Sequence, residues 1–270
     1  MSNVPSSYAL VTGGSSGMGL EYVKQLADKG YCVIIVALRQ EEADPVAAAM
    51  AAAHPTQDFV AIGMDLAVDG AGQRLYDTVT SLRPEAHVEV LINNAGIIHI
   101  RHFREMTVEQ IERIILLHNV AMATLCRLFI PAMTAEGRGY VLNISSMTAW
   151  LPYPFISTYA ATKSFTKVLT RALRTEYVGT GVHVAAIYFG AVDTPLYTLT
   201  DAWRRRLRRL GIMITPQKAA KRALCMLFRG RSGWMPGLVN KLAVVVCPLL
   251  PSSLIACIDR KVTKRMKNEK

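Results

Sequence analysis

Short apolar runs rich in β-branched residues recur along the first two thirds of this 270-residue chain, and longer stretches with helical periodicity separate them. Strands that alternate with helices in this way indicate βαβ units, whose strands lie parallel. The first runs are apolar at every position, so helices are expected on both faces of the sheet. The pattern predicts an α/β fold with a doubly wound parallel sheet, and it places strands at 8–12, 32–37, 59–64, 88–92, 140–145 and 182–188.

Unusual residues follow several of these runs, at the edge of the sheet where such folds bind ligands. T-G-G-S-S-G-M-G-L follows the first run, N-N-A-G the fourth, S-S-M the fifth and F-G-A-V-D-T-P the sixth. Gly13, Gly17 and Gly19 lie between a strand and a helix, where glycines permit a tight turn and bring a pyrophosphate close to the helix N-terminus. A glycine loop alone is often only a turn, but this context favours dinucleotide binding.

Tyr159 and Lys163 form a Y-x-x-x-K pair inside a predicted helix. Residues four apart share a helical face and have Cβ atoms roughly 6 Å apart, so both side chains can contact one ligand. A free phenol has a pKa of about 10, and a nearby ammonium lowers that pKa toward the range needed for proton transfer near neutrality. A packed tyrosine beside a solvated lysine is the commoner meaning of this spacing, so the pair needs support from other motifs.

Together these motifs resemble those of the short-chain dehydrogenase/reductase family. The family pattern T-G-x-x-x-G-x-G is matched by Thr12, Gly13, Gly17 and Gly19, and its N-N-A-G by residues 93–96. Its Y-x-x-x-K is matched by Tyr159 and Lys163, its catalytic serine by Ser146 and its helix asparagine by Asn119. The resemblance spans residues 8 to about 195. It implies a single-domain Rossmann fold and an oxidoreductase activity.

The resemblance also implies a catalytic role for each member of the set Asn119, Ser146, Tyr159 and Lys163. Tyr159 would carry the proton while hydride passes between nicotinamide and substrate, and Ser146 would hydrogen-bond the substrate oxygen. Lys163 would lower the pKa of Tyr159 and bind the nicotinamide ribose. Asn119 would interrupt helix hydrogen bonding and hold a water linked to Lys163, with a plain exposed asparagine as the alternative. Ser145 points to the opposite face of its strand, so a structural hydroxyl is expected there.

The cofactor contacts follow from the same resemblance. In the loop after the sixth run, Phe189 stands where the family has proline, so the fixed φ of proline is lost and the role of this residue stays open. No metal site is expected. The expected cofactor contacts are Thr12, Gly13, Ser15, Ser16, Gly17, Met18, Gly19, Arg39, Asp65, Leu66, Asn93, Ala95, Gly96, Tyr159, Lys163, Gly190, Val192 and Thr194.

The end of the second run bears on the choice between the two nicotinamide cofactors. An acidic residue there would select NAD(H), whereas a basic one accommodates the 2′-phosphate of NADP(H). The chain has Ala37 and Leu38 at this position, then Arg39, and no carboxylate before Glu41. NADP(H) is therefore favoured over NAD(H), with a solvated Arg39 as the alternative. Asp65 matches the family position that meets the adenine amine, unless it caps a helix.

The segment between Ser146 and Tyr159 suggests the substrate class. Its apolar side chains would form a wall beside the chemistry and suit a hydrophobic ketone or alcohol of fatty acyl, sphingoid or steroid type. Subunit packing is the alternative, because this segment often forms dimer contacts in the family. The expected substrate contacts are Met147, Trp150, Leu151, Tyr153 and Phe155.

The charge of the chain is unevenly distributed. The net charge is +11, yet residues 201–270 hold 17 Lys and Arg against 3 Asp and Glu. Leucine, valine, isoleucine and proline alternate with these basic residues, and no nucleic-acid motif is present, so an anionic membrane surface is favoured over nucleic acid. Contacts are expected through 203–210 and 241–267, although a solvated face or a dimer arm would also fit. The apolar run 242–258 contains two prolines and is too broken to span a bilayer.

The remaining features concern domain limits and location. We expect a catalytic domain at 1–231, with a substrate lid at about 195–215, and an apolar and basic extension at 232–270. Five cysteines without C-x-x-C spacing and an N-terminus without a signal peptide indicate a cytoplasmic protein. The basic and apolar tail adds a peripheral membrane association as an expectation, and the family resemblance implies a homodimer or homotetramer.

Three functions remain open at this level. The favoured one is NADP(H)-dependent reduction of a hydrophobic ketone of ketolipid, 3-ketoacyl or steroid type. An NAD-dependent hydroxysteroid or lipid-alcohol dehydrogenase is the enzymatic alternative. A non-catalytic nucleotide-sensing membrane scaffold is the alternative from another class, although a scaffold has no need of all four catalytic residues.

Overall fold

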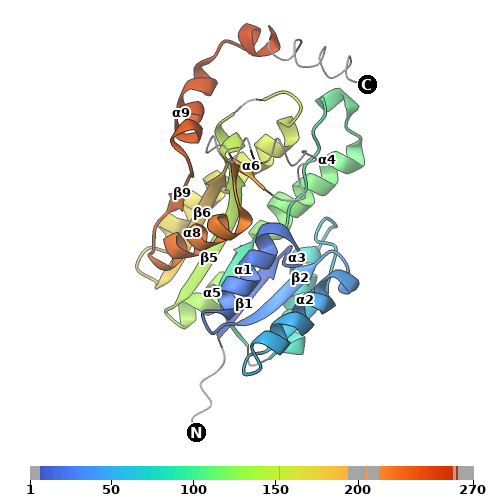
Figure 1. The fold of residues 1–270 in the computed structure, drawn as a ribbon, viewed down its shortest axis with the longest axis vertical. Helices are drawn as coiled ribbons and strands as arrows, with labels where there is room; N and C mark the ends of the chain where they lie inside the picture. The colour runs from blue at the N-terminus through green and yellow to red at the C-terminus, as the bar shows by residue number, and fades with distance from the viewer. Residues whose placement is uncertain are drawn as a thin grey trace.

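The computed structural model describes residues 7–84, 86–151, 153–193, 205, 213–257 and 260. Within them, seven strands form one parallel sheet in the order β3-β2-β1-β4-β5-β6-β9 (Figure 1). All six predicted strands are present, so the doubly wound fold is confirmed. The strands are β1 (Ser7–Thr12), β2 (Cys32–Ala37), β3 (Phe59–Gly63), β4 (His87–Asn93), β5 (Gly139–Ser146), β6 (Val182–Phe189) and β9 (Gly233–Trp234).

Helices cover both faces of the sheet. On the near side in Figure 1 lie α1 (Gly17–Ala27), α2 (Gln40–Ala53) and α8 (Pro216–Phe228). The far side carries α3 (Ala71–Leu82), α5 (Met122–Ala135) and α6 (Ser157–Glu176). Each face has its own apolar core, and β2 is buried at every position, as its uninterrupted apolar sequence predicts.

The edge strand β9 has no clear sequence signal, because it has two residues, one of them glycine. Gly233 and Trp234 pair with Ala186 and Ile187 of β6. The sheet therefore continues slightly past residue 231, where the catalytic domain was expected to end.

A long helix precedes β5. Its first part, α4 (Val108–Ile115), starts with a capping box, in which Thr107 and Gln110 bond each other's backbone N–H at 3.3 Å. The helix continues into α5 through a π-helical stretch, η2 (Leu116–Ala121), which contains Asn119. Val108–Ala135 is apolar enough to cross a membrane, but half of its most apolar window is buried in the protein, as in the core helix of a globular fold.

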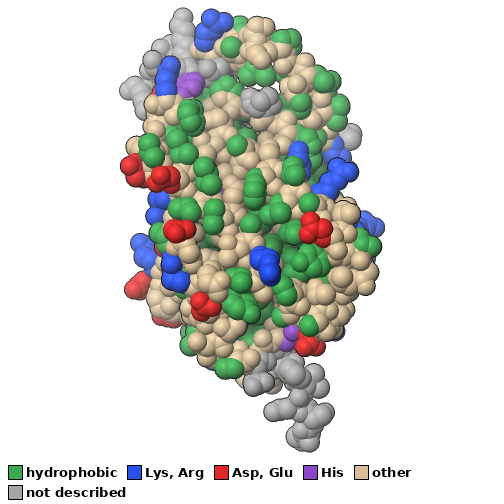
Figure 2. Space-filling model, turned by 180° about the vertical axis from the view of Figure 1, so that it is seen from behind, with side chains coloured by type: hydrophobic (Ala, Val, Ile, Leu, Met, Phe, Trp, Pro, Cys, Tyr) green, Lys and Arg blue, Asp and Glu red, His purple; other side chains and the backbone are tan. Residues whose placement is uncertain are grey.

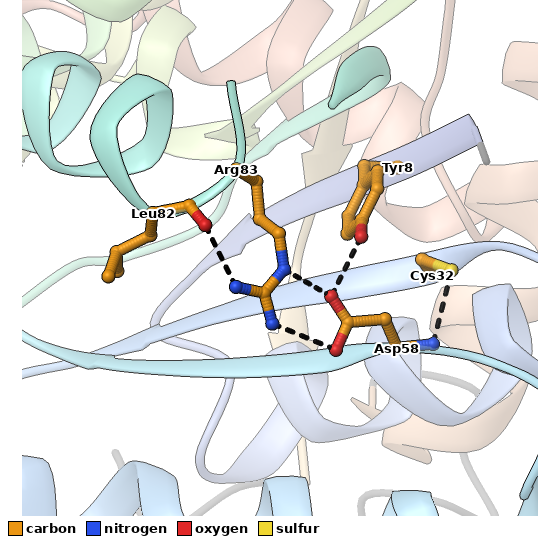
Figure 3. Close-up of polar contacts among 5 residues, drawn as sticks. All are labelled: Tyr8, Cys32, Asp58, Leu82 and Arg83. Atoms are coloured by element: carbon orange, nitrogen blue, oxygen red, sulfur yellow. Dashed lines mark hydrogen bonds and ion pairs between the residues drawn. The ribbon is translucent and has the colours of Figure 1, made fainter. Parts of the chain in front are cut away.

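A polar cluster joins four elements at the end of the sheet opposite to the strand ends that carry the motifs (Figure 3). Asp58, just before β3, accepts hydrogen bonds from Tyr8 Oη (2.7 Å) and from Arg83 Nε (2.5 Å) and Nη2 (3.1 Å). The Asp58 backbone N–H also donates to Cys32 Sγ (3.2 Å). The cluster ties β1 and β2 to the start of β3 and the end of α3.

Two surfaces expose apolar side chains. The far face carries many apolar and few charged side chains over its centre (Figure 2), and Val120, Phe165 and Val168 of η2 and α6 are exposed. The C-terminal arm, formed by α9 (Leu238–Val246), η4 (Cys247–Leu249) and residues 250–257, leads away from the sheet (Figure 1). In the arm, Leu242 and Leu249 are 63% and 79% exposed.

Candidate active site

The ends of β1 and β4 are joined at the glycine loop. Thr12 Oγ1 donates to Ile92 O (3.3 Å) and accepts hydrogen bonds from the backbone N–H groups of Asn94 and Ala95, each at 3.0 Å. The Asn94 amide donates to Thr12 O (2.9 Å) and Gly13 O (3.2 Å). The two motifs predicted from the sequence are therefore one structural unit.

The glycine loop fits the close approach of a phosphate. Gly13 has a φ of +66°, and a Cβ on Gly19 would lie 1.8 Å from Gly13 O, so glycine is required at both positions. Helix α1 starts at Gly17, and its first turn contains no acidic residue. Free N–H groups and the helix dipole favour an anion there.

A groove of about 250 Å³ extends from the loop across the ends of β2 and β3. Many of the expected cofactor contacts line it, and so does Leu38. Glu42 and Arg113 also line it, although the sequence did not predict either residue at the site. The expected contacts that line it are Gly13, Ser15, Ser16, Asp65, Leu66, Ala95 and Gly96.

Charged pairs flank this groove. Arg39 precedes α2 and pairs with Glu42 at 2.5 Å, with 69% of its side chain exposed. Asp65 accepts the Ala67 N–H (2.8 Å) and the guanidinium of Arg113 (3.0 Å). Asp65 caps no helix, because α3 begins later, after Gly70.

The Y-x-x-x-K pair lies at the start of α6. Lys163 is 6% exposed, and its Nζ donates to Ile144 O at 2.9 Å and lies 5.5 Å from the centre of the Tyr159 ring. Burial lowers the pKa of Lys163 to about 8. The positive charge thus lies next to the phenol in an environment of low dielectric, where it acts strongly.

The two serines at the end of β5 point in opposite directions, as strand geometry requires. Ser146 Oγ donates to Phe189 O (3.3 Å) and accepts the Thr148 N–H (3.2 Å). Ser145 Oγ donates to Lys163 O (2.9 Å), which makes it the structural hydroxyl expected from the sequence.

Asn119 lies in the π-helical stretch and is 8% exposed. Its side-chain amide donates to Thr162 O at 3.0 Å. The backbone around this residue has π-helical instead of α-helical hydrogen bonding, and because the side chain is buried the alternative of an exposed helix asparagine is wrong.

The loop after β6 is described only in part. Val192 is buried in β7 (Ala191–Val192), which pairs with β8 (Met213–Ile214). Gly190 packs against Asn240 of the arm, whose amide a Cβ on Gly190 would approach to 2.6 Å. Thr194 and most of the expected lid, including residues 203, 207 and 210, lie outside the described residues.

The expected substrate wall is only partly assembled around the chemistry. Trp150 packs edge-on against Tyr188 (ring centres 4.6 Å apart) with Lys167 over its ring at 4.4 Å. The Tyr153 hydroxyl donates to Cys247 Sγ of the arm (3.3 Å). The other members differ in burial, since Leu151 is buried while Met147 and Phe155 are half-buried.

One buried histidine beside the pair was missed. His118 is 3% exposed and packs edge-on against the Tyr159 ring, with ring centres 5.7 Å apart. A single histidine inside a helix has no spacing signal in the sequence. Its neighbour Asn119 matches a family motif, and His118 matches none.

Known proteins share this arrangement. Residues 7–205 match the family model for short chain dehydrogenases. The chain is 28% identical over 195 residues, 70% of its length, to the very-long-chain 3-oxoacyl-CoA reductase of Bos taurus, and the match spans 60% of that protein. It is 31% identical to the 2,5-dichloro-2,5-cyclohexadiene-1,4-diol dehydrogenase of Sphingobium indicum, over 70% of this chain and 74% of that protein. A solved short-chain dehydrogenase from Sphingobium yanoikuyae in complex with NADPH superposes with a TM-score of 0.75 at 26% identity, over 97% of this chain and 95% of that one.

Proposed function

The chain belongs to the short-chain dehydrogenase family and is an oxidoreductase, and on that basis we propose that it reduces hydrophobic ketones with NADP(H), favouring 3-oxoacyl substrates. One observation supports the proposal: the Lys163 ammonium lies 5.5 Å from the centre of the Tyr159 ring, and Lys163 lines a small cavity together with Thr12 and Ala95, which join the glycine loop to the end of β4.

A dinucleotide fits the residues at this groove. Gly13 and Gly19 permit the tight turn that leads from β1 to the N-terminus of α1, where a pyrophosphate would lie, and Asp65, Leu66 and Ala95 line the continuation of the groove toward β3. Lys163 would bind the nicotinamide ribose. A nicotinamide held there supplies or takes up the hydride.

The side chains of the catalytic set would handle the proton and the developing charge. Tyr159 would donate its phenolic proton to the substrate oxygen during reduction, and the ammonium of Lys163 would stabilise the phenolate that remains. Ser146 would donate a hydrogen bond to the same oxygen, in exchange for its bond to Phe189 O. Asn119 would hold the water that returns a proton through Lys163.

Substrate and cofactor preference rest on different residues. The bovine relative supports a 3-oxoacyl substrate, and the apolar segment of Leu151 and Phe155 fits a carbon chain. The Sphingobium indicum relative favours the alternative, dehydrogenation of a hydrophobic alcohol. Arg39 supports NADP(H), because its guanidinium is exposed at the end of β2 and could leave Glu42 for a 2′-phosphate.

The experiment is a panel of 3-ketoacyl, ketosteroid and alcohol substrates, followed by the absorbance of NADPH and of NADH. We expect NADPH-dependent reduction of a long-chain 3-ketoacyl compound and weaker binding of NADPH, but not NADH, by Arg39→Ala. Arg104→Ala is the matched control, because Arg104 also pairs with an exposed neighbour, Glu105. Equal binding of both cofactors by wild type and Arg39→Ala would remove the case for NADP(H), and turnover of alcohols alone would favour the dehydrogenase.

We also propose that the catalytic domain extends past the expected limit of 231 to include β9, with the extension after it, since β9 belongs to the same sheet. An anionic membrane surface is proposed as a partner of the arm, and a homodimer through the apolar far face. The exposed Leu242, Val245 and Leu249 support the membrane contact, and Val120, Phe165 and Val168 support the dimer.

A further inference from the structure

We propose that His118 is a positioning residue that braces the start of α6 against the loop after β4 and acts through Thr162 on Tyr159. This inference rests on the proposed function, because it concerns the geometry of the same site.

Hydrogen bonds at both ring nitrogens define the brace. His118 Nε2 accepts the Ile97 N–H at 3.0 Å, so the proton of the neutral ring lies on Nδ1, which donates to Thr162 Oγ1 at 2.9 Å. The Thr162 hydroxyl in turn donates to Tyr159 O at 2.8 Å. A single imidazole thus connects the loop after β4 to the backbone of Tyr159.

The imidazole also packs against the Tyr159 ring and against Gly96 in the loop after β4. Its plane meets the Tyr159 ring at 75°, and a Cβ on Gly96 would lie 3.0 Å from His118 Nε2. Because His118 is 3% exposed, bulk water does not compete with the imidazole for its hydrogen bonds to Ile97 and Thr162.

The π-helical stretch η2 lets two adjacent residues reach one residue of α6. His118 bonds the hydroxyl of Thr162, and Asn119 bonds its carbonyl oxygen at 3.0 Å. Thr162 is therefore the point at which η2 docks on the catalytic helix.

The brace adds no charge to the site. Burial, and then the charge of Lys163, hold the pKa of His118 well below its ordinary value, so the ring is neutral at physiological pH. Lys163 remains the cation that faces Tyr159.

The test removes the bond without changing the shape of the core. Thr162→Val deletes the hydroxyl and Thr162→Ser keeps it. Thr166→Val is the matched control, since Thr166 is about as buried as Thr162 (2% against 3% exposed) on the same helix, and its hydroxyl donates to Thr162 O rather than bonding His118. For each protein we measure kcat and KM with a ketone, and the Kd of NADPH by fluorescence. The titration of Tyr159 is followed by tyrosinate absorbance, and the absorbance of the same protein carrying Tyr159→Phe is subtracted.

We expect Thr162→Val to lower kcat by about tenfold or more with the Kd of NADPH kept, because misplacement of a catalytic group costs rate rather than binding. The titration of Tyr159 should move to higher pH, since the phenol is held less closely beside Lys163. Thr162→Ser should restore both. His118→Leu should also lower kcat, and the double variant should lose no more than the more damaging single variant, because both changes remove the hydrogen bond between His118 and Thr162.

Equal effects of Thr162→Val and Thr166→Val, or no effect of Thr162→Val on kcat and on the titration, would overturn the proposal. A Tyr159→Phe enzyme with wild-type kcat would instead refute the proposed mechanism. If no ketone is turned over, the titration alone decides: an unchanged position in Thr162→Val refutes the brace, and an upward shift supports it.

Discussion

At the scale of single residues, Lys163 combines a charge with nearly complete burial. Its ammonium donates a hydrogen bond to Ile144 O, and burial lowers its pKa to about 8 from an ordinary value near 10.5. Between these two values the unfolded chain binds more protons than the folded protein, so stability rises with pH across this window. A buried, charged Lys163 lowers the stability of the folded protein. A lysine in such a position is more typical of an acid–base site than of a purely structural role.

Lys163→Met should remove this rise. We expect the free energy of unfolding of wild type to increase from pH 8 to pH 10 relative to the variant, by up to about 3 kcal/mol for a shift of this size. Urea unfolding at the two pH values measures the difference. Lys167→Met is the control, because Lys167 is less buried and its pKa is lowered less far. Parallel pH profiles for wild type and Lys163→Met would show that the lysine is solvated.

Sequence motifs predicted the residues that lie at strand ends and missed those that tertiary packing brings in. Ser146 was separated from Ser145 because alternation along a strand is a local property. His118, Glu42 and Arg113 have no such signal, since the helix face that reaches the site depends on how α2, α4 and η2 pack.

At the scale of elements, the cluster around Asp58 joins β1, β3 and α3 away from the site. The hydrogen bond from Arg83 holds the pKa of Asp58 below its ordinary value. Burial acts in the opposite direction, and the hydrogen bond from Tyr8 lowers the pKa further. A carboxylate with a lowered folded pKa stabilises the fold above its unfolded pKa, and this contribution is lost as pH falls through the folded value. The cluster should therefore matter at neutral pH and not in acid.

Arg83→Met should lower the Tm at pH 7 by a few degrees, because a partly exposed ion pair contributes about 1 kcal/mol. Calorimetry at pH 7 and at about pH 3 measures the loss, which should shrink in acid as Asp58 is protonated. Arg104→Met is the control for removal of an exposed arginine. A loss of Tm that is independent of pH would indicate packing of the arginine stem instead.

Elements with long periodic signals were predicted well, and short ones were not. The β-branched runs of β1 to β6 carried their own signal, as did the capping box at Thr107. The edge strand β9 forms only because β6 offers it a free edge, so its pairing is a tertiary effect.

At the scale of the whole molecule, the apolar arm and the basic residues that follow it in the sequence distinguish the chain from a plain catalytic domain. Leu242, Val245 and Leu249 are exposed, and residues 238–257 contain Lys241 and no acidic residue. A surface of this composition suits the interface of an anionic bilayer. Arm contacts also reach the site, through Asn240 at Gly190 and Cys247 at Tyr153.

Binding to vesicles tests the arm. Wild type should sediment with vesicles that contain anionic phospholipid more than with neutral ones, and less so at high salt. Leu242→Ser with Val245→Ser should lose this binding, whereas Val178→Ser, a change at a 75% exposed valine outside the arm, should not. Equal sedimentation of all three proteins would assign the apolar arm to subunit contact rather than to lipid.

The central claim is that Tyr159 transfers the proton while the groove of the glycine loop holds the cofactor. The most direct measurement is kcat for NADPH-dependent ketone reduction by Tyr159→Phe, alongside the Kd of NADPH. The account predicts a loss of kcat of about a hundredfold or more, typical of a missing general acid, with the Kd little changed. A Tyr159→Phe enzyme that reduces ketones at the wild-type rate would contradict it.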